Sequence, residues 1–179
     1  MEPEENRREP EQEKEQEREQ EQAPVMACRC SYTLLDENDA EIGGGEASVE
    51  LWKENFVLQP LDGITYTLTY REIVQIDAGD YRVKLSPASG EKILLFDLGY
   101  NYEDFLRNLY RLRGEVILKD MLMQEKVSKA GLQGEYSYAD ESGALLHSGP
   151  CEPRIYETAL VVIPQTEDPL RIPFADIET

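Results

Sequence analysis

The sequence is poor in the side chains on which many catalytic and metal sites depend. It has one histidine, three cysteines and one tryptophan among 179 residues, and only 18 Lys and Arg against 37 Asp and Glu. A single histidine excludes most histidine-based metal and triad chemistry. The net charge of −19 argues against binding to nucleic acid or to an anionic membrane, because both attract Lys and Arg.

Long apolar runs are also missing. No stretch approaches the roughly 20 apolar residues that cross a bilayer, and the N-terminus lacks the apolar core of a signal peptide. Three cysteines without an evident disulfide framework fit a reducing compartment better than a secreted protein. We therefore expect a cytoplasmic protein, with a length that suits one ordinary domain or two small ones.

The first 22 residues are almost entirely Glu, Gln, Arg and Lys. Such a segment buries too little apolar surface to offset its ordering entropy, so residues 1–25 are predicted to be a disordered acidic leader. It is either an acidic interaction tail or a dispensable solubilising leader, and Met26 is an alternative natural start. The leader holds ten acidic and four basic residues, which leaves 27 and 14, or −13, on the remainder.

Between residues 28 and 98, apolar and polar residues alternate, which is typical of half-buried strands. Turn-forming clusters separate the apolar stretches, among them the acidic Asp36–Asp39 and the Asp62–Gly63 pair that favours a hairpin. The glycine run Gly43–Gly45 is interpreted as a further break. Seven strands are predicted, at 28–34, 49–52, 56–58, 64–70, 73–76, 81–85 and 93–96.

Beyond Gly99 the apolar spacing changes to three and four, the period of an amphipathic helix. We predict a helix over 101–130 that begins with an Asn101 cap and kinks or splits at Gly114. The residues of its apolar face are Phe105, Leu109, Leu112 and Val116.

The sequence also repeats itself at an offset of 104 residues. Residues 32–75 align with 136–179 without a gap, and eight positions are identical, where composition alone would give roughly two or three. The apolar alternation is preserved as well, which indicates a tandem duplication. The second copy, 131–179, holds only four strands and the start of a fifth. Because such a sheet leaves a missing core wall, we expect a chain that continues beyond Thr179, or a second copy that packs on the first copy or on another chain.

Seven strands followed by one amphipathic helix resemble the pleckstrin-homology-like (PH-like) superfold, which includes GRAM-type and bacterial PH-like domains. The stretches that carry the resemblance are VELWKENFVL at 49–58, ITYTLTYREI at 64–73, RIYETALVVI at 154–163 and LRIPFADI at 170–177. The resemblance implies a mainly β fold with one long helix. In this fold, a seven-stranded antiparallel barrel capped by a C-terminal helix forms domain 1 at 26–130, and 131–179 forms a partial second copy.

The best-known activity of that family, binding of phosphoinositide headgroups, uses Lys and Arg of the first hairpin loop. Here that loop reads DENDAE at 36–41, and its counterpart reads DESG at 140–143. These carboxylates would repel a phosphate, so we do not expect phosphoinositide or membrane binding. Many PH-like domains bind peptides or proteins instead, and the resemblance leaves that function open.

The cysteines and the histidine do not form a convincing chemical site. Cys28 and Cys30 are two apart on a strand and therefore share a face, where two buried cysteines are the simpler interpretation than half of a metal or redox site. The remaining candidates, Cys151 and His147, both lie in the second copy. His147 is interpreted as a solvated loop residue rather than a catalyst.

Two other groups have residue types that occur in anion-binding sites. Arg107, Arg111 and Arg113 are interpreted as a solvated helix face, with an anion site as the alternative. Gly43–Gly45 is not followed by the GK[ST] sequence of a phosphate-binding loop. We therefore expect no catalytic, cofactor-binding or metal-binding residues.

The sequence favours a non-enzymatic PH-like interaction or scaffold module that binds a protein or peptide partner, with a basic partner suited to its charge. The alternative is a fragment of a larger enzyme or regulator whose functional part lies beyond Thr179. The oligomeric state and the identity of the partner are not determined by the sequence.

Overall fold

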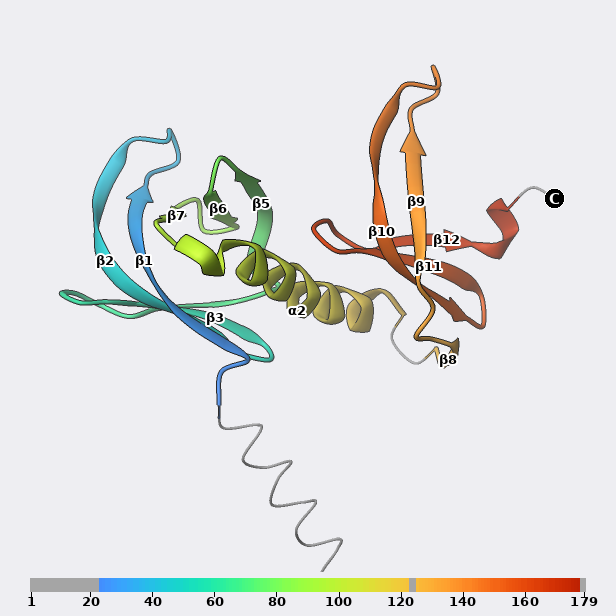
Figure 1. Ribbon diagram of the computed structural model, residues 1–179, viewed down its shortest axis with the longest axis horizontal. Coiled ribbons are helices and arrows are strands. Elements are labelled where there is room, and N and C mark those ends of the chain that lie inside the picture. Colours follow the sequence, from blue (N-terminus) through green and yellow to red (C-terminus); the bar gives the residue numbers. More distant parts are fainter. Residues whose placement is uncertain (1–22, 123–124, 178–179) are drawn as a thin grey trace, which may run out of the picture.

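The computed structural model describes residues 23–122 and 125–177, so the predicted leader lies outside the described residues except for its last three positions. The described part forms twelve strands, one long helix and two short 3-10 helices (Figure 1). No helix within it is long and apolar enough to cross a membrane.

The first seven strands form one curled antiparallel sheet with the order β4-β3-β2-β1-β7-β6-β5. All seven strands expected from the alternating pattern are present. Their bounds are β1 (Met26–Leu35), β2 (Glu41–Leu51), β3 (Asn55–Pro60), β4 (Tyr66–Thr69), β5 (Ile73–Gly79), β6 (Arg82–Pro87) and β7 (Lys92–Phe96).

The long helix α2 (Tyr102–Leu122) follows β7 after a short 3-10 turn, η2 (Gly99–Asn101). Its apolar face is buried against the inner face of the curled sheet and forms one core with it. The helical residues of this core are Phe105, Leu106, Leu109, Leu112 and Val116. The fold is thus mainly β with one long helix, in the order expected of a PH-like fold.

A second sheet follows α2 and has the order β12-β11-β10-β8, with β9 also paired to β10. Because β9 pairs with the first part of β10 and β8 with its last two residues, both lie along the same edge of β10. The elements are β8 (Val127–Lys129), β9 (Gly134–Ala139), β10 (Leu145–Tyr156), β11 (Ala159–Pro164) and β12 (Leu170–Pro173), followed by η3 (Phe174–Asp176).

The pairing registers of the two sheets coincide at an offset of 104 residues. In the first sheet Tyr32 lies opposite Gly45, and in the second Tyr136 lies opposite Gly149. The β2–β3 and β3–β4 pairings recur in the same way: Leu51 with Phe56 becomes Ile155 with Leu160, and Leu58 with Tyr66 becomes Val162 with Leu170.

The first hairpin turn is repeated as well. The Asp36 carboxylate accepts hydrogen bonds from the backbone N–H groups of Asn38 and Ala40, at 2.8 and 2.9 Å. In the second sheet, the carboxylate of Asp140 accepts the corresponding bonds from the two residues at 142 and 144, both at 2.9 Å. The aspartate of each loop therefore serves to build the turn.

Three sequence expectations need correction. The helix ends at Leu122 instead of 130, and 127–129 form strand β8, whose β-branched Val127 pairs with Tyr156. Gly43–Gly45 do not break the chain but lie inside β2. A Cβ on Gly44 would lie 2.7 Å from the carbonyl oxygen of Tyr32, so glycine is needed there for the close approach of two strands. Gly114 does not split α2, which is continuous through it.

Candidate interaction surface

Helix α2 contacts the two sheets on opposite sides. It covers the inner face of the first sheet, whereas its Leu118 packs with Tyr156 and Val161 of the second sheet. The positions 104 residues before these two are Trp52 and Val57, and neither belongs to the buried core of the first sheet. The second sheet therefore presents its outer face to α2, and its inner face points away from the helix (Figure 1).

A buried arginine ties α2 to both sheets. Arg113 donates hydrogen bonds to the backbone carbonyl of Ile73, at 3.0 and 3.2 Å, and to that of Val74 at 3.3 Å. It also forms an ion pair with Asp168 in the loop between β11 and β12. Burial lowers the pKa of the Arg113 guanidinium. The expectation of a solvated face is therefore wrong for Arg113, because backbone carbonyls of strand β5 give it partners inside the fold.

A second arginine joins the helix to β10. Arg154 donates to both carboxylate oxygens of Glu115, at 2.7 and 3.2 Å, and to Glu152 at 2.7 Å. The hydrogen bonds with Glu115 raise the pKa of Arg154, and the bond from Arg154 lowers the pKa of Glu152. Nearby, Gly114 lets Pro169 approach the helix, since a Cβ on Gly114 would lie 3.3 Å from the proline ring. The second sheet is thus held against α2 by these contacts.

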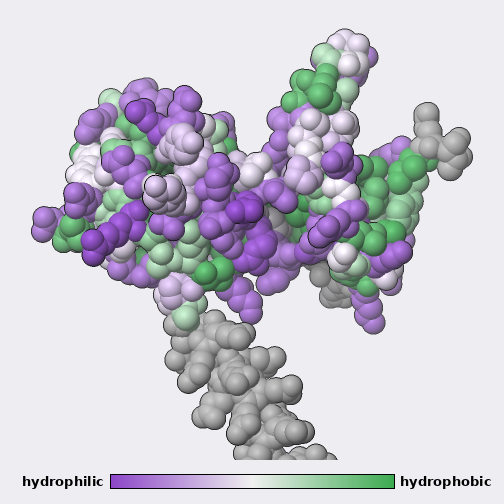
Figure 2. All heavy atoms as spheres, viewed as in Figure 1, coloured by the Kyte–Doolittle hydropathy of each residue, from purple (hydrophilic) through white to green (hydrophobic). Residues whose placement is uncertain are grey.

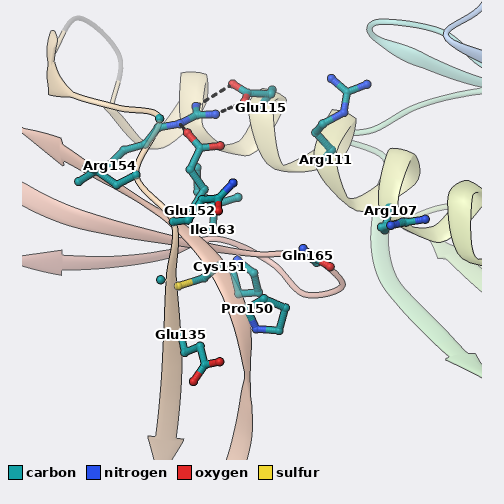
Figure 3. Close-up of a pocket in the computed structure, with 15 residues that line it drawn as sticks. Arg107, Arg111, Glu115, Glu135, Pro150, Cys151, Glu152, Arg154, Ile163 and Gln165 are labelled. Atoms are coloured by element: carbon teal, nitrogen blue, oxygen red, sulfur yellow. Dashed lines mark hydrogen bonds and ion pairs between the residues drawn. The ribbon is translucent and has the colours of Figure 1, made fainter.

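A cleft of about 870 Å³ opens between the exposed side of α2 and the second sheet (Figure 3). Arg107 and Arg111 lie on its helix side, exposed as expected, and Glu135 and Cys151 lie on its sheet side. Arg107 pairs with Asp104, and Arg111 donates to Asn108, both within α2. Because its two walls carry charges of both signs, the cleft is not a basic site that would favour an anion.

The inner face of the second sheet has no covering helix among the described residues. Tyr70 and Ile73, both core residues of the first sheet, are 1% exposed, whereas their counterparts Phe174 and Ile177 are each 43% exposed. Figure 2 shows apolar side chains gathered on this side of the second sheet. We call this surface the open face. Its exposed members are Tyr138, Leu170, Phe174 and Ile177, its half-buried members are Tyr136, Leu160 and Ile172, and Val162 between them is buried.

The rim of the open face carries a carboxylate. Glu167, in the loop between β11 and β12, lies 2.9 Å from Nδ1 of the exposed His147. Burial, together with a hydrogen bond to Glu167, raises the pKa of Tyr136 to about 12. Thus His147 is exposed, as expected, but it lies in strand β10 and not in a loop, because it pairs with Tyr138 of β9.

The outer edge of β9 is unpaired within the described residues. In the first sheet, β1 is flanked on both sides, by β2 and by β7, and residues 31–35 pair with 92–96. In the second sheet, β9 pairs with β10 only. Residues 135–139 therefore present an open strand edge beside the open face.

The cysteines lie apart from this surface or at its border. Cys30 is buried and Cys28 half-buried in the first sheet, and burial raises the pKa of Cys30 to about 12. Cys151 is a half-buried free thiol on β10. Across residues 23–122 and 125–177, no group of three or more His, Cys, Asp or Glu is arranged to hold a metal ion.

The acidic loop of the first hairpin has basic neighbours that its own sequence does not show. The ammonium group of Lys92 on β7 donates to the carbonyl of Glu37 at 3.1 Å and to the carboxylate of Asp39 at 2.9 Å. Lys84 on β6 lies 3.8 Å from the same carboxylate. The hydrogen bond from Lys92 lowers the pKa of Asp39. Both lysines are thus engaged by acids of the fold.

The fold class shown by these features is a curled antiparallel sheet with one long helix. No protein-family model and no curated protein matches the sequence. Among solved structures, the chain is similar to the C-terminal domain of an unknown protein from Leishmania infantum, with 9% identity and a TM-score of 0.40 over 56% of this chain and 96% of that one. It is also similar to a chain of the Spt16D Pob3N heterodimer, with 14% identity and a TM-score of 0.32 over 83% and 96%. At these TM-scores, neither similarity supports an argument about function.

Proposed function

We propose that this chain is a non-enzymatic protein-interaction module whose open face binds an amphipathic helix of a protein partner. The observation that carries the proposal is the contrast between Tyr70 and Phe174, which occupy the same register position but are 1% and 43% exposed. An exposed cluster of large apolar side chains is unfavourable in water unless a partner covers it. The first sheet provides the template for that partner, because α2 covers the same face there.

The chemistry of the partner follows from this template and from charge. Its helix would carry apolar residues at spacings of four, three and four, as Phe105, Leu109, Leu112 and Val116 do on α2. Residues 131–177 hold eight acidic and two basic side chains, a net charge of −6. Both arginines, Arg154 and Arg171, already pair with glutamates. A helix with Lys and Arg beside its apolar stripe is therefore the complementary ligand.

The proposal includes a domain organisation. Two PH-like copies of GRAM type would span 26–130 and 131–179 in a cytoplasmic protein, and the second copy would be completed by the partner. The shared registers at an offset of 104 and the repeated aspartate turns at Asp36 and Asp140 support the duplication.

A peptide probe tests the proposal on the full chain. The probe is a fluorescein-labelled peptide with the sequence of α2, residues 102–122, made basic at its polar positions. Its substitutions are Glu103→Lys, Asp104→Lys, Glu115→Lys and Asp120→Lys. We expect binding by fluorescence anisotropy that weakens as salt is added, because the rim of the open face is acidic.

The matched pair of variants is Phe174→Asp on the open face and Leu61→Asp, an exposed leucine in the loop after β3. Phe174→Asp should weaken probe binding about tenfold or more, and Leu61→Asp should leave it unchanged. Far-UV circular dichroism confirms that both variants are folded. The proposal fails if the probe does not bind the wild-type chain, or if Phe174→Asp binds it as tightly as Leu61→Asp.

A further inference from the structure

We infer that the same partner also supplies a β-strand, immediately before its helix, that pairs antiparallel with the outer edge of β9. This inference rests on the proposed function and specifies the partner further: a strand, a short link and an amphipathic helix. The corresponding segment of the first copy is β7, η2 and α2, in which five residues, 97–101, connect the strand to the helix.

The first sheet gives the register of the missing strand. On β7, the buried Ile93 and Leu95 lie opposite Leu34 and Tyr32 of β1. The residues of β9 at the same positions are Tyr138 and Tyr136. The partner strand would therefore place apolar side chains opposite Tyr138 and Tyr136, two residues apart, as Ile93 and Leu95 are on β7.

The backbone of β9 is oriented to accept such a strand. The N–H of Asp140 donates to the carbonyl of Ala144 and closes the β9–β10 hairpin. Because alternate residues of an antiparallel strand bond to the same neighbour, Tyr136 and Tyr138 bond towards β10. The backbone groups of Glu135, Ser137 and Ala139 then point to the open edge.

The edge of β9 also lacks two of the residue types that usually protect an open strand. Its six residues, GEYSYA, include no proline and no lysine. By contrast, β12 at the other side of the same sheet is four residues long and ends in Pro173. Strand β9 is thus a better template for strand addition than β12.

The test compares two probes on the full chain. The helix probe is the basic α2 peptide described above, and the strand–helix probe extends it to residues 92–122, so that it begins with KILLF. The strand should tighten binding about tenfold or more, because each added backbone hydrogen bond contributes a modest net amount. Hydrogen exchange should slow at the amides of Glu135, Ser137 and Ala139 only with the longer probe.

Ser137→Pro and Ser137→Val separate edge pairing from other effects. Proline at 137 removes an outward N–H and leaves the bonds to β10 in place, whereas valine keeps the N–H and favours a strand. The gain from the strand should vanish in Ser137→Pro and persist in Ser137→Val, with the helix probe binding both equally. If Ser137→Pro unfolds, hydrogen exchange of the wild-type chain still tests whether the probe strand pairs with β9.

The outcomes distinguish this inference from the proposed function. If the helix probe binds the open face but the strand adds no affinity and no protection of β9, the strand inference is wrong and the helix site stands. If neither probe responds to Phe174→Asp, the proposed function is wrong. A chain that already dimerises through β9, seen by sedimentation and abolished by Ser137→Pro, would overturn the inference of a separate partner.

Discussion

The two sheets of this protein share their strand registers and differ in the side that α2 covers. Positions 104 residues apart pair alike, yet Tyr70 and Ile73 of the first sheet are buried, whereas Phe174 and Ile177 at the matching positions are exposed. The apolar pattern of a strand therefore sets its pairing but not the identity of the element that covers it. In the second sheet, α2 packs on the outer face, and we propose that the inner face it leaves uncovered serves as an interaction surface.

The largest expected effect is the difference in stability cost between matching substitutions on the inner faces of the two sheets. Tyr70→Ala removes a buried ring and a hydroxyl that donates to the carbonyl of Trp52 at 2.7 Å, and should cost about 4 kcal/mol of unfolding free energy. Phe174→Ala, at the matching position, should cost less, about 1 kcal/mol, because Phe174 is 43% exposed. Urea unfolding followed by far-UV circular dichroism measures both. Equal costs would show that the two faces are equally packed.

A smaller effect is expected where the two sheets are joined. Arg113→Met deprives the carbonyls of Ile73 and Val74 of their donor and leaves Asp168 without its partner, at a cost of about 2–3 kcal/mol. Arg107→Met is the control, since Arg107 is exposed on the same helix and should change stability by less than about 0.5 kcal/mol. A loss in Arg107→Met as large as in Arg113→Met would contradict a specific role of the buried arginine.

The hairpins of the two sheets differ at one informative position. Gly44 corresponds to Ser148. A Cβ added at Gly44 would lie 2.7 Å from the carbonyl oxygen of Tyr32, whereas position 148 already carries a side chain. Gly44→Ala should therefore cost about 1–3 kcal/mol by forcing β1 and β2 apart. Ser148→Ala should be neutral within about 0.5 kcal/mol. Thermal unfolding measures the stability of both variants. A neutral Gly44→Ala would mean that β1 and β2 separate at little cost.

The elements of the first sheet were predictable because each strand alternates cleanly and each turn contains its own signals. The break predicted at Gly43–Gly45 was wrong, because in sequence a glycine that permits a close strand approach cannot be distinguished from one that ends a strand. The helix was predicted too long because Val127 continues its apolar spacing while pairing with Tyr156 in a sheet. In both places a tertiary contact overrides the local pattern.

The candidate site was only partly accessible from sequence. The alignment of 32–75 with 136–179 and the four strands predicted there already indicated a second sheet without a complete core. Nothing in the pattern of Tyr156 and Val161 showed that α2 would pack on the outer face, since that depends on Leu118 and on the close approach at Gly114. The role of Arg113 was likewise hidden, because its partners are backbone carbonyls that only the fold brings near.

The smallest expected effect is a loss of stability at low pH, caused by protonation of Glu152 at the junction between α2 and β10. The hydrogen bond from Arg154 lowers the folded pKa of Glu152 below its ordinary value of 4.5. Its stabilising contribution is therefore complete above that value and is lost as the pH falls through the folded pKa. The carboxylate is partly solvated, so the loss should stay below about 1 kcal/mol.

The variant Glu152→Gln tests the contribution of Glu152 to the pH dependence of stability. Between pH 6 and pH 3 the variant should lose less stability than the wild-type chain, because glutamine cannot take up the proton; these pH values span roughly the carboxylate range. The acids of the first sheet, such as Asp39 with its bond from Lys92, titrate in both proteins and cancel in the comparison. Identical pH profiles for the two proteins would show that Arg154 holds the second sheet through Glu115 alone.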